Sequence, residues 1–145
     1  MSETHKKIAV GFIVVAILGV LWIFGRPKRA EAITNKREYP VGSELVVSIQ
    51  NNLGRGICFS ECYPYFLQKN GGDTGNWQNY EYGKCQDFDA AIDCVQDRGF
   101  KEFRLPLEDV DPGLNRLMIP VCLGCQTGDK FNRDTAIYSN TFQVR

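Results

Sequence analysis

The sequence predicts an all-β sandwich of about seven short strands with one short helix, preceded by a single N-terminal transmembrane helix. Three observations carry this prediction. One long uncharged run lies near the N-terminus, short runs with strand-like patterns separated by turn residues fill the rest, and all six cysteines lie in that second part. The sequence has no internal repeat. No series of long helices alternates with the expected strands, which favours a sandwich over a parallel α/β sheet.

The uncharged run covers residues 8–25 and is eighteen residues long. As a helix it would measure roughly 27 Å at about 1.5 Å per residue, close to a hydrocarbon core of roughly 30 Å. Basic residues flank both ends, and Trp22 stands near one boundary, where an amphipathic ring is favoured. We therefore expect a cytoplasmic tail at 1–7, a transmembrane helix at 8–25 and a juxtamembrane linker at 26–38.

A cleaved signal peptide is the main alternative to this anchor. Ala30-Glu31-Ala32 has the small-x-small form of a cleavage site. However, the uncharged run is longer than the roughly 7–15 residues of a signal core, and three basic residues separate it from these alanines. A buried core helix is the other alternative, but a core helix rarely lacks a polar face over this length. The pattern favours an uncleaved anchor.

Two features of the sequence disagree about which side of the membrane the domain occupies. Three basic residues follow the uncharged run and two precede it, which on the positive-inside rule would leave the domain in the cytoplasm. Against this, six cysteines form an even and dense set, and disulfides persist only in oxidising compartments. A long domain can also cross a membrane despite flanking charge. We expect a single-pass cell-membrane protein whose C-terminal domain is extracytoplasmic.

The soluble part predicts a series of short strands. Leu45, Val47 and Ile49 occupy every second position and share one face, which is typical of a half-buried strand over 44–50. Residues 65–69 and 77–82 flank a glycine-rich loop and predict a hairpin. Further strands are expected at 57–59, 103–105, 117–121, 136–138 and 141–144.

Residues 87–99 differ from the rest and predict the one short helix. Asp89 can cap its start, Ile92 and Val95 share a face at helical spacing, and Gly99 supplies the stop.

The order of these segments resembles a known class of domain. The matching motifs are Tyr39-Pro40-Val41-Gly42-Ser43-Glu44, Ile49-Gln50-Asn51-Asn52, Cys62-Tyr63-Pro64-Tyr65, Leu67-Gln68-Lys69 leading to Trp77, Asp111-Pro112-Gly113 with Arg116-Leu117, and the terminal Tyr138-Ser139-Asn140-Thr141-Phe142-Gln143-Val144. Together, over roughly residues 39–145, they resemble bacterial immunoglobulin-like domains of exported, membrane-anchored proteins. The resemblance is at fold level and implies a binding or structural module without naming a ligand. One departure is Asn115, which stands where such domains often place a tyrosine.

The resemblance also implies a disulfide between Cys62 and Cys85, because a cysteine before the Pro-Tyr strand joins one after the Trp strand in such domains. The geometry of a hairpin agrees with this pair. Two further pairs have other origins: Cys122 with Cys125 rests on proximity in sequence alone, and Cys58 with Cys94 is left by elimination. Six cysteines allow fifteen pairings, so the framework stays open at this point.

Four of the cysteines offer an alternative, a cytoplasmic zinc-binding domain. The set would be Cys58, Cys62, Cys122 and Cys125. Two short-spaced pairs can supply the four thiolates of a tetrahedral site, but a regular knuckle has two residues between the members of each pair, whereas the first pair here has three. Disulfides are favoured, and we expect no metal and no cofactor. A redox role of Cys122 and Cys125 is not favoured, because no helix signal follows them.

Catalytic motifs are lacking. The only histidine is His5, in the N-terminal tail, so the folded domain cannot contain a histidine-based triad of its own. The acidic set Asp87, Asp89, Asp93 and Asp97 lacks the spacing of a calcium loop and is interpreted as a solvated face. We expect no enzyme, with a sandwich-based enzyme or a protease inhibitor acting through a loop as the alternative.

Aromatic residues gather around the predicted hairpin. On a strand over 77–82, Trp77 would face opposite to Tyr80 and Tyr82, so one set must point outwards or against the other sheet. Such aromatics pack in cores more often than they bind ligands. An outward set would form a contact surface for a protein, with a glycan as the alternative. Residues 31–145 are net acidic by four charges, with sixteen acidic and twelve basic groups, so no nucleic-acid partner is expected.

These observations together predict a membrane-tethered, extracytoplasmic interaction or structural module of the cell envelope or of a surface assembly.

Overall fold

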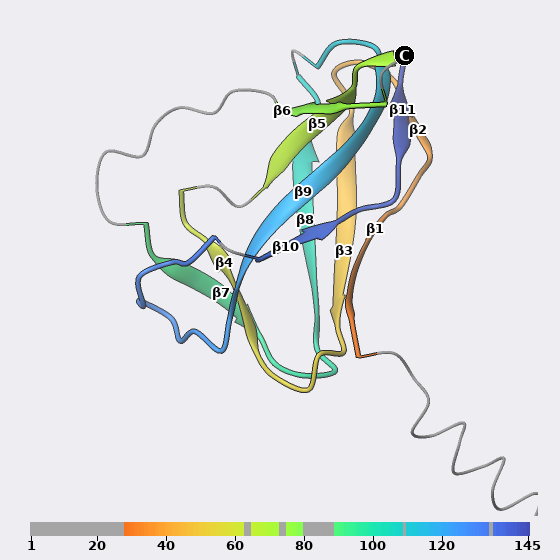
Figure 1. Ribbon diagram of the computed structural model, residues 1–145. Coiled ribbons are helices and arrows are strands. Elements are labelled where there is room, and N and C mark those ends of the chain that lie inside the picture. Colours follow the sequence, from red (N-terminus) through yellow and green to blue (C-terminus); the bar gives the residue numbers. More distant parts are fainter. Residues whose placement is uncertain (1–27, 63–64, 73–74, 80–88, 109, 134) are drawn as a thin grey trace, which may run out of the picture.

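Two packed β-sheets form the part of the chain that the computed structural model describes (Figure 1). The described residues are 28–62, 65–72, 75–79, 89–108, 110–133 and 135–145. Within these ranges, none of the structure is a helix long and apolar enough to cross a membrane. The predicted cytoplasmic tail and the predicted transmembrane helix at 8–25 lie outside the described residues.

The smaller sheet has three antiparallel strands in the order β1-β3-β8. Their bounds are Ala30–Thr34 for β1, Glu44–Asn51 for β3 and Phe100–Pro106 for β8. Leu45, Val47 and Ile49 on β3 are no more than 1% exposed, so the predicted inward face of this strand is confirmed.

The larger sheet is built around β9, an eleven-residue strand from Gly113 to Leu123. β9 pairs with four strands: β4 and β5 follow one of its edges, and β10 and β11 follow the other. β6, β7 and β2 extend this sheet by pairing with β5, β4 and β11. The bounds are Glu38–Tyr39 (β2), Ile57–Ser60 (β4), Phe66–Asn70 (β5), Trp77–Asn79 (β6), Ala91–Val95 (β7), Thr135–Tyr138 (β10) and Phe142–Val144 (β11).

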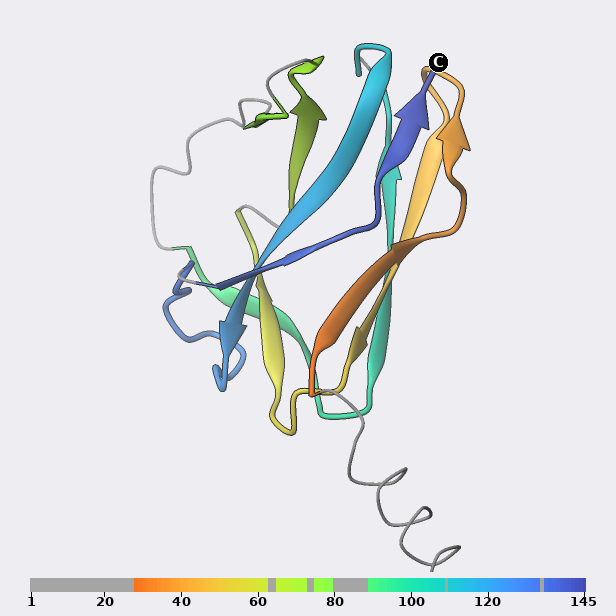
Figure 2. The ribbon, with the colours of Figure 1, turned by 45° about the vertical axis from the view of Figure 1, so that its right-hand side comes forward.

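The core lies between the two sheets, which Figure 2 shows as two layers with β1, β3 and β8 on one side. Ile57 and Phe59 of β4 and Leu117, Ile119 and Val121 of β9 pack in one cluster with the inward residues of β3. All five are at most 1% exposed. Burial of this apolar surface is the main force that holds the layers together. The predicted all-β sandwich is therefore confirmed.

The first strand lies where the sequence predicted a linker. β1 falls within 26–38 and pairs along its whole length with β3. Its inward residues Ala30, Ala32 and Thr34 are all small, whereas Ile33 is 56% exposed. Hydrophobic periodicity is therefore almost absent from this strand, and backbone hydrogen bonds to β3 take its place. Asn140 further secures it by accepting a bond from the Thr34 backbone N–H at 2.8 Å and donating one to the Thr34 hydroxyl.

The prediction of a short helix within 87–99 is wrong, because the described part of this segment contains strand β7. Ile92 pairs with Phe59 and Val95 with Ile57, so three positions on β7 span two on β4. The extra residue is a β-bulge, and Asp93 within it has a φ of 48°. The bulge gives two residues on one face of a strand the i, i+3 spacing of a helix, which explains the error.

Asn115 and Tyr39 are both buried and both make hydrogen bonds inside the fold. Asn115, at the position where the domains that the sequence resembles often have a tyrosine, is fully buried and donates its amide to the Gly113 carbonyl at 2.7 Å. Tyr39 instead ties the chain between β1 and β2: its buried hydroxyl donates to Asn35 Oδ1 and accepts from the Lys36 backbone N–H. Its ring packs edge-on against Phe142.

Candidate functional site

The outer face of the larger sheet presents a group of side chains drawn from four strands. On β9 the core residues Leu117 and Ile119 point inward, so Arg116 and Met118 point outward. The strand register places partners beside them: Phe66 and Tyr138 lie opposite Met118, and Gln68 lies opposite Arg116. We call this group the stacked face. Its members are Phe66, Gln68, Trp77, Asn79, Arg116, Met118 and Tyr138.

Arg116 is held between two aromatic rings in the middle of the stacked face. Its guanidinium carbon lies 4.2 Å from the centre of the Trp77 ring and 4.5 Å from the centre of the Tyr138 ring. Both distances are within the roughly 6 Å range of a cation–π interaction. Three strands, β6, β9 and β10, therefore contribute one side chain each to a single ring–cation–ring stack.

An amide network beneath the rings fixes the Arg116 side chain. Arg116 Nε donates to Gln68 Oε1 at 2.7 Å, and Gln68 Nε2 donates to Asn79 Oδ1 at 2.6 Å. Gln68 is only 6% exposed, so its hydrogen bonds are shielded from water and hold the guanidinium in place.

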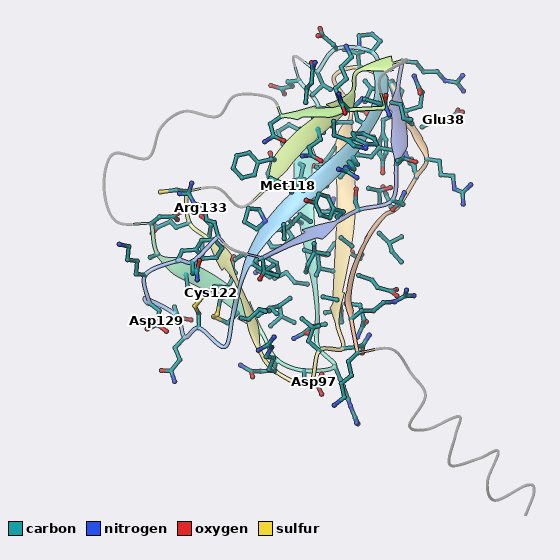
Figure 3. The ribbon with its side chains drawn as sticks, viewed as in Figure 1. Glu38, Asp97, Met118, Cys122, Asp129 and Arg133 are labelled. Carbon is teal, nitrogen blue, oxygen red and sulfur yellow. A yellow bond between two sulfur atoms is a disulfide. The ribbon has the colours of Figure 1, made fainter. Side chains whose placement is uncertain are left out.

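The stack is accessible, and the described residues do not neutralise its positive charge. Tyr138 is 49% exposed, and Trp77 and Arg116 are half-buried. In the described part of the chain, no carboxylate forms an ion pair with Arg116. Figure 3 labels Met118 on β9, beside strand β5.

The structure brings together only part of the contact surface that the sequence predicted. Trp77 lies on the stacked face, whereas the predicted Tyr80 and Tyr82 lie outside the described residues. Sequence reasoning missed Arg116 and Tyr138. The alternation of Leu117 and Ile119 with their neighbours carried a signal that Arg116 points outward, but the meeting of three strands could not be read from local pattern.

Four cysteines gather at the opposite end of β9, beside its pairing with β4. Cys58 and Cys122 are direct cross-strand neighbours. Cys58 is bonded to Cys94, with Cα atoms 4.0 Å apart, and Cys122 to Cys125, with Cα atoms 5.7 Å apart. Both pairs were predicted, Cys58–Cys94 by elimination and Cys122–Cys125 from their proximity in sequence. Cys62 is also disulfide-bonded, and its predicted partner Cys85 lies outside the described residues.

These bridges differ in what they add to stability. Cys58 and Cys94 are 36 residues apart, and closing a loop of that size stabilises a fold by about 4 kcal/mol in the chain-entropy model. Cys122 and Cys125 are 3 residues apart, for which the same model gives about 2 kcal/mol. Disulfide bonding also leaves Cys58 and Cys122 unavailable as zinc thiolates. Among the residues that the structure describes, no cluster of His, Cys, Asp and Glu suits a metal ion.

Asp89 is not part of a solvated face, contrary to the sequence interpretation, whereas Asp87 lies outside the described residues. The Asp89 side chain is only 12% exposed and accepts hydrogen bonds from the Ser60 hydroxyl at 2.6 Å and from Arg133. Burial would raise the pKa of Asp89, but the hydrogen bonds from Ser60 and Arg133 outweigh it and lower the pKa below its ordinary value. Asp93 pairs with Lys101 at 2.6 Å. Asp89 joins the end of β4 to the loop before β10, and Asp93 joins β7 to β8, so both carboxylates have structural roles.

Comparisons with known proteins give a fold-level likeness only. No family model and no curated protein matches the chain. Among solved structures, a Pseudomonas fluorescens alkylpurine DNA glycosylase, AlkC, matches 80% of this chain with 9% identity and a TM-score of 0.41, and the match spans only 30% of the glycosylase chain. The CARDB domain of PF1109 from Pyrococcus furiosus matches 81% of this chain and 88% of its own, with 13% identity and a TM-score of 0.39.

A PapD-like domain of human CEP192 gives a similar result, with 12% identity, a TM-score of 0.34, and coverage of 81% of this chain and 82% of that one. TM-scores between 0.34 and 0.41 are too low to assign this chain to a fold family. They carry no argument about ligand, activity or partner.

Proposed function

We propose that this chain is a membrane-tethered, extracytoplasmic interaction module that binds a protein partner through the stacked face. The observation that carries the proposal is the stack of Arg116 between Trp77 and Tyr138 on an outward sheet surface. Trp, Tyr and Arg are the three residue types most enriched among the residues that dominate binding energy at protein interfaces.

The stack is organised before any partner arrives. Immobilising a long side chain on binding costs about 0.5–1.5 kcal/mol, and Arg116 is already held by two rings and by Gln68. Its guanidinium has five N–H donors in a rigid fork, of which Gln68 takes the one on Nε. A carboxylate or main-chain carbonyl of a partner is the natural acceptor for the others.

Two features of the fold support the tether and the compartment. The disulfides Cys58–Cys94 and Cys122–Cys125 are expected outside the reducing cytoplasm. Cleavage after Ala32, as a signal peptidase would require, would also remove the first three of the five residues of β1. The buried Ala32 would be lost from the core, so an uncleaved anchor at 8–25 suits the fold better. We propose no catalytic residue, cofactor or nucleic-acid partner.

Site-specific photo-crosslinking of the full chain in its own membranes tests the partner proposal. A photoreactive residue at Met118 should capture one defined protein, whereas the same residue at Ser48, on the outer face of the other sheet, should not. With that protein purified, Arg116→Ala and Tyr138→Ala should each weaken binding by about tenfold or more.

Arg104→Ala is the matched control, because Arg104 lies on the other sheet and pairs only with acidic side chains there. It should leave binding unchanged. Equal capture at Met118 and Ser48, or full binding by the stack variants, would contradict the proposal. Capture of a glycan in place of a protein would reassign the face to glycan binding.

A further inference from the structure

The end of the sandwich where the described chain begins has its own surface. The Arg29 carbonyl accepts a hydrogen bond from the Asn52 backbone N–H at 3.1 Å, which fixes the chain entry beside the β3–β4 turn. The β7–β8 turn lies next to it, because the Asn51 backbone N–H donates to the Gly99 carbonyl at 2.9 Å. Figures 1 and 2 show both turns and the start of β1 at one end, with the C-terminus at the other.

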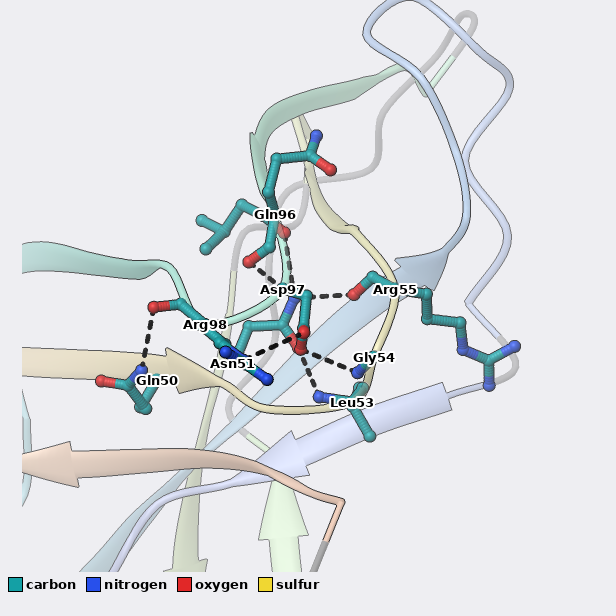
Figure 4. A network of polar contacts seen from close by, with 9 residues as sticks. Gln50, Asn51, Leu53, Gly54, Arg55, Gln96, Asp97 and Arg98 are labelled. Carbon is teal, nitrogen blue, oxygen red and sulfur yellow. Dashed lines mark hydrogen bonds and ion pairs between the residues drawn. The ribbon is translucent and has the colours of Figure 1, made fainter. Parts of the chain in front are cut away.

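A single buried side chain makes the two turns rigid. Asn51 is fully buried, and its Nδ2 donates to the carbonyls of Arg55, Val95 and Gln96 at 2.8, 3.0 and 3.1 Å. Figure 4 shows this network at the junction of the turns. Asp97 adds a bond across the junction by accepting from the Gly54 backbone N–H at 2.8 Å. Hydrogen bonds therefore hold the surface on these two turns in a defined conformation.

This surface combines positive charge with an exposed aromatic ring. Phe100 is 72% exposed, and the Arg98 side chain is 88% exposed. Two acids share this end, and both are engaged: Glu31 pairs with Arg29, and Asp97 bonds Gly54 and lies 3.8 Å from Arg98. We call this surface the entry end. Its exposed basic and aromatic members are Lys28, Arg29, Arg55, Arg98 and Phe100.

The entry end is positive on a domain that is otherwise negative. Its four basic residues exceed its two acids by two charges, whereas the remainder of residues 28–145 carries ten basic and fourteen acidic groups and is net −4. An anionic surface would attract this end and repel the rest of the domain, so the charge distribution alone would orient the molecule.

Chain length places this end close to a lipid surface if 8–25 spans the membrane. From residue 25 to Arg29 the chain can extend by at most about 14 Å, since an extended residue spans roughly 3.3–3.6 Å. The headgroup layer is itself about 5–8 Å thick on each side. The entry end therefore cannot move far from the phosphate groups, whichever way the domain leans.

We propose that the entry end binds anionic phospholipid headgroups through Arg29, Arg55 and Arg98, with Phe100 inserted at the interface. This inference rests on the proposed membrane tether. Guanidinium groups bind phosphate oxygens in a bidentate manner, and an aromatic side chain next to basic residues is typical of surfaces that lie in the interfacial region. In this orientation the entry end contacts the membrane. The stacked face then points along the membrane surface, towards neighbouring proteins.

Hydrogen exchange of the full chain in lipid nanodiscs tests the proposal. One set of discs contains only phosphatidylcholine, and the other also contains phosphatidylglycerol. In the anionic discs at low salt, amides of 52–56 and 96–100 should exchange at least about fivefold more slowly, which is the effect of a single basic side chain that engages anionic lipid. The difference should disappear at about 1 M salt, where the Debye length falls to about 3 Å.

The double variant Arg55→Glu/Arg98→Glu should lose the protection, and the milder Arg55→Gln/Arg98→Gln should reduce it. Lys36→Glu/Arg37→Glu is the control with equal charge change, placed beside Glu38 and away from the entry end (Figure 3), and it should keep the protection. Unchanged exchange in strand β3 verifies that each variant is folded.

Equal exchange in both kinds of disc, with the chain incorporated, would overturn the lipid contact and leave the tether standing. Failure of the chain to elute with the discs would overturn both proposals.

Discussion

Replacing Asn51 with alanine should cost the domain about 3 kcal/mol of unfolding free energy. The side chain is fully buried, donates to three carbonyls and accepts from the Leu53 backbone N–H at 3.1 Å. An amide nitrogen has only two hydrogens, so the three carbonyls share two bonds and the side chain makes three in all. At about 1 kcal/mol net for each bond, the expected loss is about 3 kcal/mol.

Denaturant unfolding of the oxidised full chain in mild detergent, followed by near-ultraviolet circular dichroism, measures this loss. Asn52→Ala is the matched control: Asn52 is exposed and its substitution should change stability by less than about 0.5 kcal/mol. Hydrogen exchange should show the loss first in the turns that Asn51 joins, at 52–56 and 96–99. An Asn51→Ala variant as stable as the control would refute the assignment of Asn51 as the link between the two turns.

Two other substitutions test the fold and its charges. Val47→Asp should unfold the domain, because Val47 is 1% exposed and an unpaired carboxylate cannot be accommodated in the core. Ser48→Asp on the outer face should be tolerated. Equal tolerance of the two substitutions in a thermal melt would show the register of β3 to be wrong. Asp89→Asn should cost about 2 kcal/mol at pH 7, since hydrogen bonds to a charged group are at stake. The lowered pKa of Asp89 means that its ionised form favours the fold above about pH 4 and that this contribution is lost as the pH falls below that value. A pH-stability profile of the variant should therefore be flatter in that range than the profile of the unsubstituted chain, and parallel profiles would contradict the role of Asp89.

Some elements could be predicted from the sequence because one physical signal dominates them. In β3 the buried apolar residues Leu45, Val47 and Ile49 occupy every second position, and a period of two with one buried side allows one register only. The hairpin of β5 and β6 could also be predicted, because a glycine-rich loop joins two strand-like runs. The structure pairs these two strands antiparallel.

Other elements depend on contacts that local pattern does not record. β1 has only small inward residues and exists because β3 offers a free edge. β7 carries a bulge at Asp93 that gives Ile92 and Val95 a helical spacing, and only the pairing with β4 reveals the strand. The candidate site belongs to this second class, because Trp77, Arg116 and Tyr138 are far apart in sequence and meet only through the order of strands.

Intact-mass spectrometry of the native protein tests the central claim most directly. The protein would be extracted from its own membranes with thiols blocked at lysis, so that redox state, metal content and N-terminus are read from one spectrum. The account predicts a chain that retains residues 8–25, with all six cysteines oxidised and therefore unblocked, and with no metal bound. A chain beginning at Ile33 would contradict the tether, and six blocked thiols or a retained zinc ion would contradict the extracytoplasmic, disulfide-bonded domain.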